Sequence, residues 1–150
     1  MGIGLNEDKV CFQQVGIVPR AINTIFTRIN EEQQNPSFKF KITVSFMELY
    51  NEELCDLLNN KKGGGVTPTI REDGSGKIVW LNLVEETVSS SDEILALLEK
   101  GTKCRSTGST DMNATSSRSH AIFTITLSKY IGSSSTVSKF HFVDLAGWNY

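Results

Sequence analysis

Residues 38–50 constrain the fold of this chain more than any other stretch of the sequence. Apolar and polar side chains alternate there with a period of two, which is the period of a β-strand. A strand of this length needs neighbouring strands and a core against its apolar face, so it predicts the interior of a sheet. The apolar face is expected to carry Phe40, Ile42, Val44 and Phe46.

The flanking sequence predicts helices, hairpins and further strands. Apolar residues recur with helical spacing in 16–35, and Gly-rich residues 73–76 separate two β-rich runs as in a hairpin. A second helix is expected to begin at the capping box Ser90–Glu93 and to end near Gly101. The remaining expected elements are a single helical turn in 51–58, a short strand at 83–88, and strands at 121–130 and 137–144. The order predicts an α/β fold with a mixed central sheet, flanking helices and hairpins.

Composition narrows the class of protein. The 150 residues suit one domain, and the 15 basic and 17 acidic residues give a net charge of −2, so no global field favours nucleic acid or a membrane. Cys11, Cys55 and Cys104 are odd in number and include no Cys-x-x-Cys pair. This argues against a disulfide framework or a zinc site and fits a reducing compartment. Without a long apolar run or a leader-like N-terminus, we expect a cytosolic or nuclear protein.

The sequence Asp144-Leu145-Ala146-Gly147 follows a predicted strand and is the first candidate site. An Asp at the carboxyl end of a strand can hold a hydrated Mg²⁺. Gly147 lets a backbone N–H approach a phosphate closely. Many buried strands also end in Asp-x-x-Gly, so this pattern alone fits an ordinary structural turn as well.

The sequence Asn-Ala-Thr-Ser-Ser-Arg-Ser-His at 113–120 is the second candidate site, and it immediately precedes a predicted strand. Ser116 and Ser117 could contact Mg²⁺ or water, and Asn113 could reach a phosphate oxygen or orient water. Arg118 could pair with an acid across the site. A structural alternative is a serine-rich loop with local turns. A serine hydrolase that uses His120 is disfavoured, because adjacent residues in a strand point to opposite faces and no Gly-x-Ser-x-Gly elbow is present.

Several stretches, taken together, resemble the kinesin motor domain. Residues 113–120 resemble its switch I signature, Asn-x-x-Ser-Ser-Arg-Ser-His, and residues 144–147 resemble the start of its switch II, Asp-Leu-Ala-Gly-Ser-Glu. Residues 16–21 resemble its Gly-Ile-Ile-Pro-Arg-Ala helix start, and residues 45–58 resemble its Tyr-x-Glu-Ile-Tyr-Asn-Glu…Asp-Leu-Leu segment. The resemblance covers nearly the whole chain. The segment from Ile70 and the helix before switch I are most similar to the chromokinesin branch.

The resemblance implies an ATP-driven microtubule motor with a P-loop-NTPase-like core, and with ATP and Mg²⁺ as cofactors. It implies that Ser117 contacts Mg²⁺ and the γ-phosphate, and that Ser116 and Asn113 line the γ-phosphate and the attacking water. It implies that Asp144 binds Mg²⁺ through water and that the Gly147 amide senses the γ-phosphate.

The resemblance also implies a role for Arg118, which would pair with the switch II Glu. The implied partner is the microtubule, which would face the hairpin loop at 73–77; a solvated surface turn is the alternative for that loop. The 150 residues carry no membrane or nucleic-acid signature and no oligomerisation element. The implied location is the cytoplasm and cytoskeleton, or the nucleus and spindle for a chromokinesin-like protein.

Two departures from the family pattern limit what we expect of the chain. It contains no Gly-x-x-x-x-Gly-Lys-[Ser/Thr] sequence, and Met1-Gly2 resembles residues that follow the P-loop. We therefore expect 1–150 to be one partial motor domain, from just after the P-loop to the start of switch II. Trp148 and Asn149 stand where the family has Ser and Glu, which leaves Arg118 without its ionic partner.

These departures predict a fragment that alone neither binds ATP tightly nor hydrolyses it at a useful rate. They also predict an exposed hydrophobic sheet edge and low solubility. The alternatives are a non-catalytic tubulin- or partner-binding fragment and an unrelated α/β domain.

Overall fold

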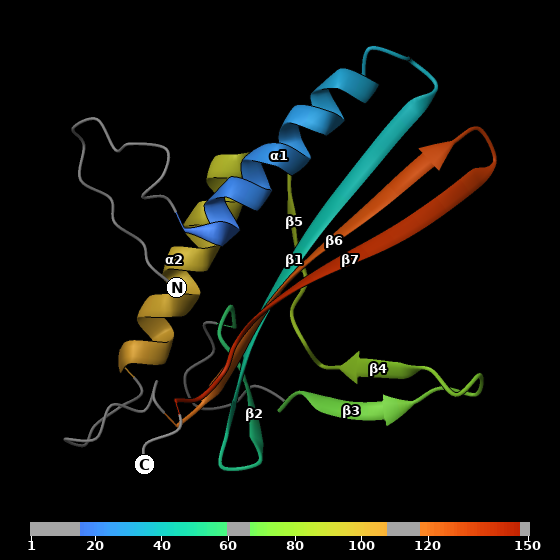
Figure 1. Cartoon of the computed structure of the whole chain (residues 1–150). Coiled ribbons are helices and arrows are strands. Elements are labelled where there is room, and N and C mark those ends of the chain that lie inside the picture. Colours follow the sequence, from blue (N-terminus) through green and yellow to red (C-terminus); the bar gives the residue numbers. More distant parts are fainter. Residues whose placement is uncertain (1–15, 60–66, 108–117, 148–150) are drawn as a thin grey trace, which may run out of the picture.

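The computed structural model describes residues 16–59, 67–107 and 118–147. The described helices are α1 (Ile17–Glu32) and α2 (Ser91–Thr107). Both helices lie on the same face of the central sheet, and the β3–β4 hairpin extends away from them (Figure 1). The strands are β1 (Phe38–Tyr50), β2 (Glu53–Asp56), β3 (Thr69–Glu72), β4 (Ile78–Leu81), β5 (Glu86–Val88), β6 (His120–Ile131) and β7 (Ser134–Asp144). The expected α/β class, with a central sheet, helices and hairpins, is confirmed.

The central sheet has the strand order β2-β1-β6-β7, and β5 also pairs with β1. The pairs β1–β6 and β6–β7 are antiparallel along almost the whole length of each strand. Their register places Val44, Ile125 and Phe140 side by side across three strands. The strand predicted at 38–50 is confirmed at both ends, and its apolar face is the face that the helices cover.

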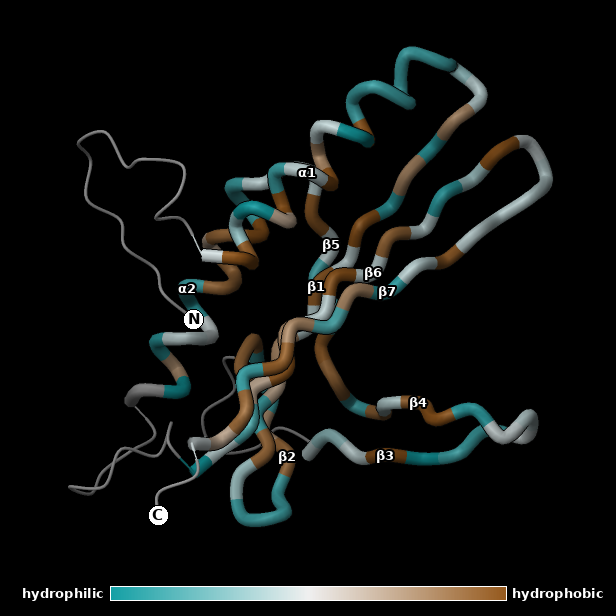
Figure 2. Tube along the Cα trace, viewed as in Figure 1, coloured by the Kyte–Doolittle hydropathy of each residue, from teal (hydrophilic) through white to brown (hydrophobic). Residues whose placement is uncertain are grey.

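The core lies between the two helices and this face of the sheet. Hydrophobic residues line the facing sides of the helices and strands (Figure 2). The rings of Phe46 on β1 and Phe123 on β6 meet edge to face at 5.2 Å, a favourable aromatic geometry. Ile22 of α1 and Ile94 of α2 are fully buried against this layer. In the described part of the chain, no helix is long and apolar enough to cross a membrane.

The segment at 51–58 was predicted as a helical turn, and this prediction is wrong. Tyr50 pairs with Glu53, so Asn51 and Glu52 alone connect β1 to β2. Their φ angles are 50° and 64°, the left-handed values that a two-residue type I′ hairpin turn requires. Asn at the first position is a signal for this turn, but the glutamate that replaces the usual Gly hides it.

The expected end of the second helix near Gly101 is also wrong, because α2 continues to Thr107. A Cβ at Gly101 would lie 2.2 Å from Cδ1 of Phe46. The glycine therefore allows α2 to approach β1 closely instead of terminating the helix. The extra turns of helix carry Arg105 over the sheet.

Two shorter elements follow the prediction more closely. The hairpin of β3 and β4 is confirmed, and Asp73 organises its turn by accepting the N–H of Ser75 at 2.9 Å and that of Lys77 at 3.0 Å. The strand expected at 83–88 is shorter, since β5 covers only Glu86–Val88. At the start of the expected strand, a side chain takes the place of a strand partner: Val84 donates its N–H to Oδ2 of Asp56 at 2.7 Å.

Candidate functional site

The two candidate stretches meet where β6 begins and β7 ends. The strands are antiparallel neighbours, and Ala121 pairs with Asp144. The backbone N–H of Ala146 donates to Nδ1 of His120 at 3.1 Å, which requires the ring tautomer with its proton on Nε2. The described ends of the two stretches are therefore directly bonded. Asn113, Ser116 and Ser117 lie outside the described residues.

A buried arginine on α2 joins both stretches. Arg105 donates from Nη1 to Oδ2 of Asp144 at 2.7 Å and from Nη2 to the carbonyl oxygen of Ser119 at 2.9 Å. Its Nε lies 3.3 Å from Oε1 of Glu48, and the Ser119 hydroxyl donates to the same oxygen at 2.5 Å. One guanidinium thus connects α2 to β1, to the residue that precedes β6, and to β7.

Helix and strand periodicity explain how Arg105 reaches Glu48. Arg105 lies four residues after Gly101, so both are on one face of α2. Glu48 lies two residues after Phe46, so both are on one face of β1. One helical turn rises about 5.4 Å and two strand residues rise about 6.8 Å. Because Gly101 and Phe46 are in close contact, the arginine one helical turn later on α2 meets the glutamate two residues later on β1.

The ion pair between Arg105 and Glu48 is energetically important because both residues are buried, as is Ser119, which bonds to both. A buried carboxylate is tolerated only when it is paired and hydrogen-bonded. Breaking a buried pair by removing one partner typically costs about 3–5 kcal/mol. The network therefore holds the beginning of β6 and the end of β7 in one fixed arrangement.

Reading the sequence did not find Arg105 or Glu48, although one signal was available. Glu48 continues the apolar face of β1 after Phe46, so it was predictable that a carboxylate lies on the core face. Such a group needs a cationic partner, and a basic residue on a covering helix was the candidate. The choice of Arg105 depended on knowing that α2 continues past Gly101.

Asp144 is the described residue that could serve a metal ion. Its side chain is 40% exposed and sits at the carboxyl end of β7, so a hydrated cation can reach a hard oxygen donor there. Among the described residues, no group of three or more His, Cys, Asp or Glu side chains forms a metal site. Asp144 therefore offers a single carboxylate, which it shares with Arg105, and its role toward a hydrated Mg²⁺ stays a prediction.

Arg118 and Gly147 are both exposed at this end of the sheet. Arg118 lies immediately before the buried Ser119, and Gly147 immediately after Ala146. Both are therefore next to residues that the network fixes. Their roles toward a phosphate stay predictions.

Residues 8–149 match the kinesin motor domain family. The chain belongs to this family. It is 44% identical to the mouse kinesin-like protein KIF27 over 146 residues, which cover 89% of this chain and 10% of the relative. It is 42% identical to the mouse chromosome-associated kinesin KIF4 over 150 residues, which cover 98% of this chain and 12% of the relative.

A solved kinesin structure has the same fold as this chain. The structure of a fast kinesin superposes with a TM-score of 0.77 at 32% identity, over 88% of this chain and 36% of that chain. That structure has implications for the ATPase mechanism of the fast kinesin and for its interactions with microtubules. This chain thus spans about a tenth of the curated kinesins that it matches and about a third of the solved one. The resemblance to the kinesin motor domain is confirmed.

Proposed function

We propose that this chain is part of an ATP-dependent microtubule motor and contributes the two switch segments of its nucleotide site. The observation that carries the proposal is the junction of β6 and β7. There, Arg105 bonds both Ser119, at the end of the switch I stretch, and Asp144, at the start of the switch II stretch. Two segments that respond to the same phosphate must be held side by side, and this network supplies that arrangement.

The proposed roles follow the family pattern. Ser117 contacts Mg²⁺ and the γ-phosphate, while Ser116 and Asn113 line the γ-phosphate and the attacking water. Asp144 holds Mg²⁺ through water, and the Gly147 amide contacts the γ-phosphate. The bound ion supplies positive charge that offsets the negative charge developing on the phosphate oxygens.

The two arginines of the site have different proposed roles. Arg105 positions the Asp144 carboxylate from the side of α2, to which it is bonded at 2.7 Å. Arg118 pairs with an acid in the family, but Asn149 stands at the matching position here and carries no charge. We therefore propose that Arg118 makes no switch-to-switch ion pair within these 150 residues.

We propose further that the 150-residue polypeptide, as one partial motor domain, binds Mg-ATP weakly and does not hydrolyse it at a useful rate. The sequence holds no Gly-x-x-x-x-Gly-Lys-[Ser/Thr] loop to cradle the phosphates. Titration calorimetry with Mg-ATP tests this, with Asp144→Asn as the matched control. We expect little heat from either protein, and a micromolar affinity that the control abolishes would refute the proposal.

A second candidate function is microtubule or tubulin binding without ATPase activity. The exposed β3–β4 hairpin favours it, because this element forms a separate sheet whose turn is ordered by Asp73. Co-sedimentation with microtubules in the absence of nucleotide separates the two candidates, since only the second predicts clear pelleting. Lys77→Glu in the hairpin should then reduce pelleting, and Lys39→Glu, exposed on β1, serves as the charge-matched control.

The proposed location is microtubules in the cytoplasm. A nuclear or spindle location would accompany a chromokinesin-like parent, since one relative at 42% identity is named a chromosome-associated kinesin. Relatives named KIF27 are 44% identical to this chain, which is about the same as the chromosome-associated kinesin. The branch of the family to which the chain belongs is therefore also a proposal. Localisation of the tagged chain in interphase and mitotic cells distinguishes the two.

A further inference from the structure

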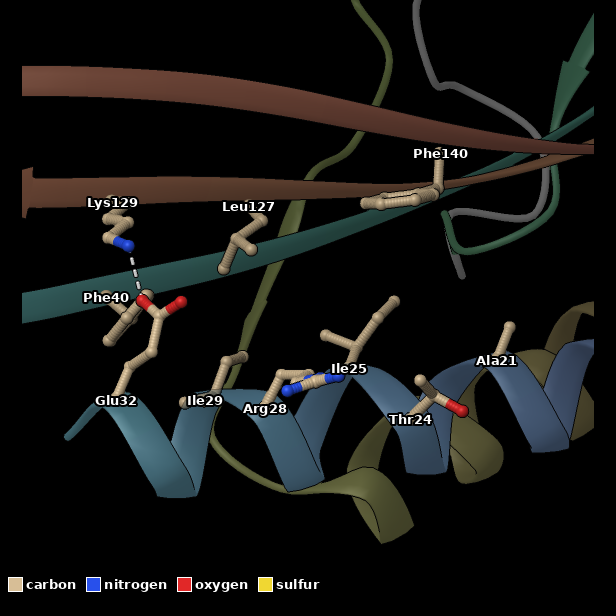
Figure 3. Close-up of a pocket in the computed structure, with 10 residues that line it drawn as sticks. All are labelled: Ala21, Thr24, Ile25, Arg28, Ile29, Glu32, Phe40, Leu127, Lys129 and Phe140. Carbon is tan, nitrogen blue, oxygen red and sulfur yellow. Dashed lines mark hydrogen bonds and ion pairs between the residues drawn. The ribbon is translucent and has the colours of Figure 1, made fainter. Parts of the chain in front are cut away.

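The two helices pack unevenly against the sheet. Between α1 and the sheet lies an apolar groove of about 410 Å³, with Ile25 and Leu127 among its lining residues (Figure 3). Helix α2 instead comes so close to β1 that a Cβ at Gly101 would lie 2.2 Å from Cδ1 of Phe46. Short side chains near Gly101 can therefore reach from α2 to the sheet, and Cys104 is one of them.

Cys55 lies on β2, beside the buried ion pair between Glu48 and Arg105. Strands β1 and β2 are antiparallel, and Cys55 is the direct partner of Glu48. Directly paired residues of antiparallel strands project from the same face of the sheet. Glu48 contacts Arg105 of α2 at 3.3 Å, so Cys55 projects from the face that α2 covers.

Helical periodicity places Cys104 on the side of α2 that faces β2. Lys100 donates from Nζ to the carbonyl oxygen of Leu58, just after the end of β2, at 3.0 Å. Cys104 lies four residues after Lys100 and therefore on the same stripe of the helix. The next residue, Arg105, bonds Asp144 of β7, on the opposite side of β1 in the strand order. The two consecutive residues thus diverge, and Cys104 is directed toward the strand that carries the other cysteine.

The electrostatics of Cys55 support the same placement. Burial raises the pKa of Cys55 most, followed by the carboxylates of Glu48 and Asp56 and by the thiol of Cys104. Ionisable groups shift one another's pKa only over short distances. The Cys55 thiol is therefore close to Cys104 in space, and its raised pKa keeps it protonated at neutral pH.

We propose that Cys55 and Cys104 form a redox-modification site, at which a hydroperoxide converts the two thiols into a reversible disulfide between β2 and α2. Cys104 reacts first, because Cys55 is the more strongly protonated thiol. Its thiolate attacks hydrogen peroxide, the O–O bond breaks, and a sulfenic acid and a hydroxide form. The Cys55 thiolate then attacks the sulfenic sulfur, the S–S bond forms, and the S–O bond breaks with loss of a second hydroxide. The hydroxides take up the two thiol protons, so two thiols and one peroxide give one disulfide and two waters.

The bridge would act on the network that joins the two switch stretches. Disulfides span Cα separations of about 4.4–6.8 Å, and the close approach of α2 at Gly101 brings the helix toward that range. The bond would fasten the turn of α2 that carries Arg105, which holds both Ser119 and Asp144. The proposal requires only the fold and no nucleotide, so it stands or falls separately from the proposed motor function.

The 150-residue chain with Cys11→Ser, treated with hydrogen peroxide under native conditions, tests the proposal. We expect a monomer that loses two hydrogens in its intact mass, regains both thiols in dithiothreitol, and yields a peptide joining Cys55 to Cys104. Bridging should be at least about tenfold faster in buffer than in concentrated urea, because the fold holds the two thiols at a short, fixed separation. In single Cys→Ser variants of this chain, dimedone should label Cys104 more rapidly than Cys55.

The matched control moves one thiol by a single helical position. Cys104→Ser combined with Lys103→Cys keeps two thiols, but position 103 is turned about 100° around the helix and its side chain is 72% exposed. This control should bridge at least about tenfold more slowly, and circular dichroism establishes that it is folded. A control that bridges as fast as Cys104, equal rates with and without urea, or thiols that oxidise separately or only between chains would overturn the proposal.

Discussion

Replacing Arg105 tests the energetics of the network that joins the two switch stretches. Arg105→Met keeps an apolar stem of similar length but removes the guanidinium from Glu48, Ser119 and Asp144. Glu48 is then a buried carboxylate with no cation, and the loss of one partner from a buried pair costs about 3–5 kcal/mol. Urea unfolding, followed by circular dichroism, should show this decrease in the free energy of unfolding.

A double variant separates the effect of the orphaned charge from a simple packing effect. Glu48→Gln combined with Arg105→Met removes that charge, so the double variant should recover at least about 1 kcal/mol relative to Arg105→Met alone. Arg28→Met is the control, because the Arg28–Glu31 pair is exposed and such pairs contribute about 0–1 kcal/mol. A cost for Arg105→Met no larger than for the control, or a double variant less stable than Arg105→Met, would refute the account.

Two further predictions concern the helix contact and the hairpin turn. Gly101→Ala should destabilise the chain, because a Cβ 2.2 Å from the ring of Phe46 forces a shift that costs about 1–3 kcal/mol. This cost outweighs the roughly 1 kcal/mol of added helix propensity. Adding Phe46→Leu should reduce the penalty, and a Gly101→Ala variant that is more stable in thermal unfolding would contradict this. The hydroxyl of Ser75 and the amides of Lys77 and Ser75 lower the pKa of Asp73. The turn is therefore stabilised by the Asp73 carboxylate above the ordinary aspartate pKa of about 3.9, and this stabilisation is lost as pH falls through the lower pKa of Asp73 in the folded chain. The protection of the Ser75 and Lys77 amides from exchange, relative to an unstructured peptide at the same pH, should show that acid dependence in the unmodified chain and not in Asp73→Asn.

The sequence was most informative where a periodic pattern was long. The alternation at 38–50 predicted both ends of β1 and the face that meets the core, since no other regular structure has a period of two. The helical spacing before it predicted α1, and Ile22 and Ile29 are buried as expected. These patterns are local, so they depend on few neighbours.

Prediction failed where a residue served a distant contact. Gly101 was interpreted as a helix end because nothing local shows that Phe46 lies against it. Glu52 adopts a left-handed conformation that is rare for its residue type, so the β1–β2 hairpin was missed. The bonds from Arg105 to Glu48 and Asp144 span 57 and 39 positions, and the strand order that creates them is not encoded in any single segment. The residues of the candidate site were thus predictable by motif, whereas the residue that holds them together was not.

We propose that the two polar stretches form one cation- and phosphate-responsive site at the junction of β6 and β7. Titration with Mn²⁺, a paramagnetic substitute for Mg²⁺, tests it most directly in an amide NMR spectrum of the chain. We predict that signals of residues 118–121 and 144–147 broaden together, and that Asp144→Asn abolishes the effect while Asp92→Asn, in the first turn of α2, leaves it intact. Broadening confined to one stretch, or broadening that survives Asp144→Asn, would contradict the account.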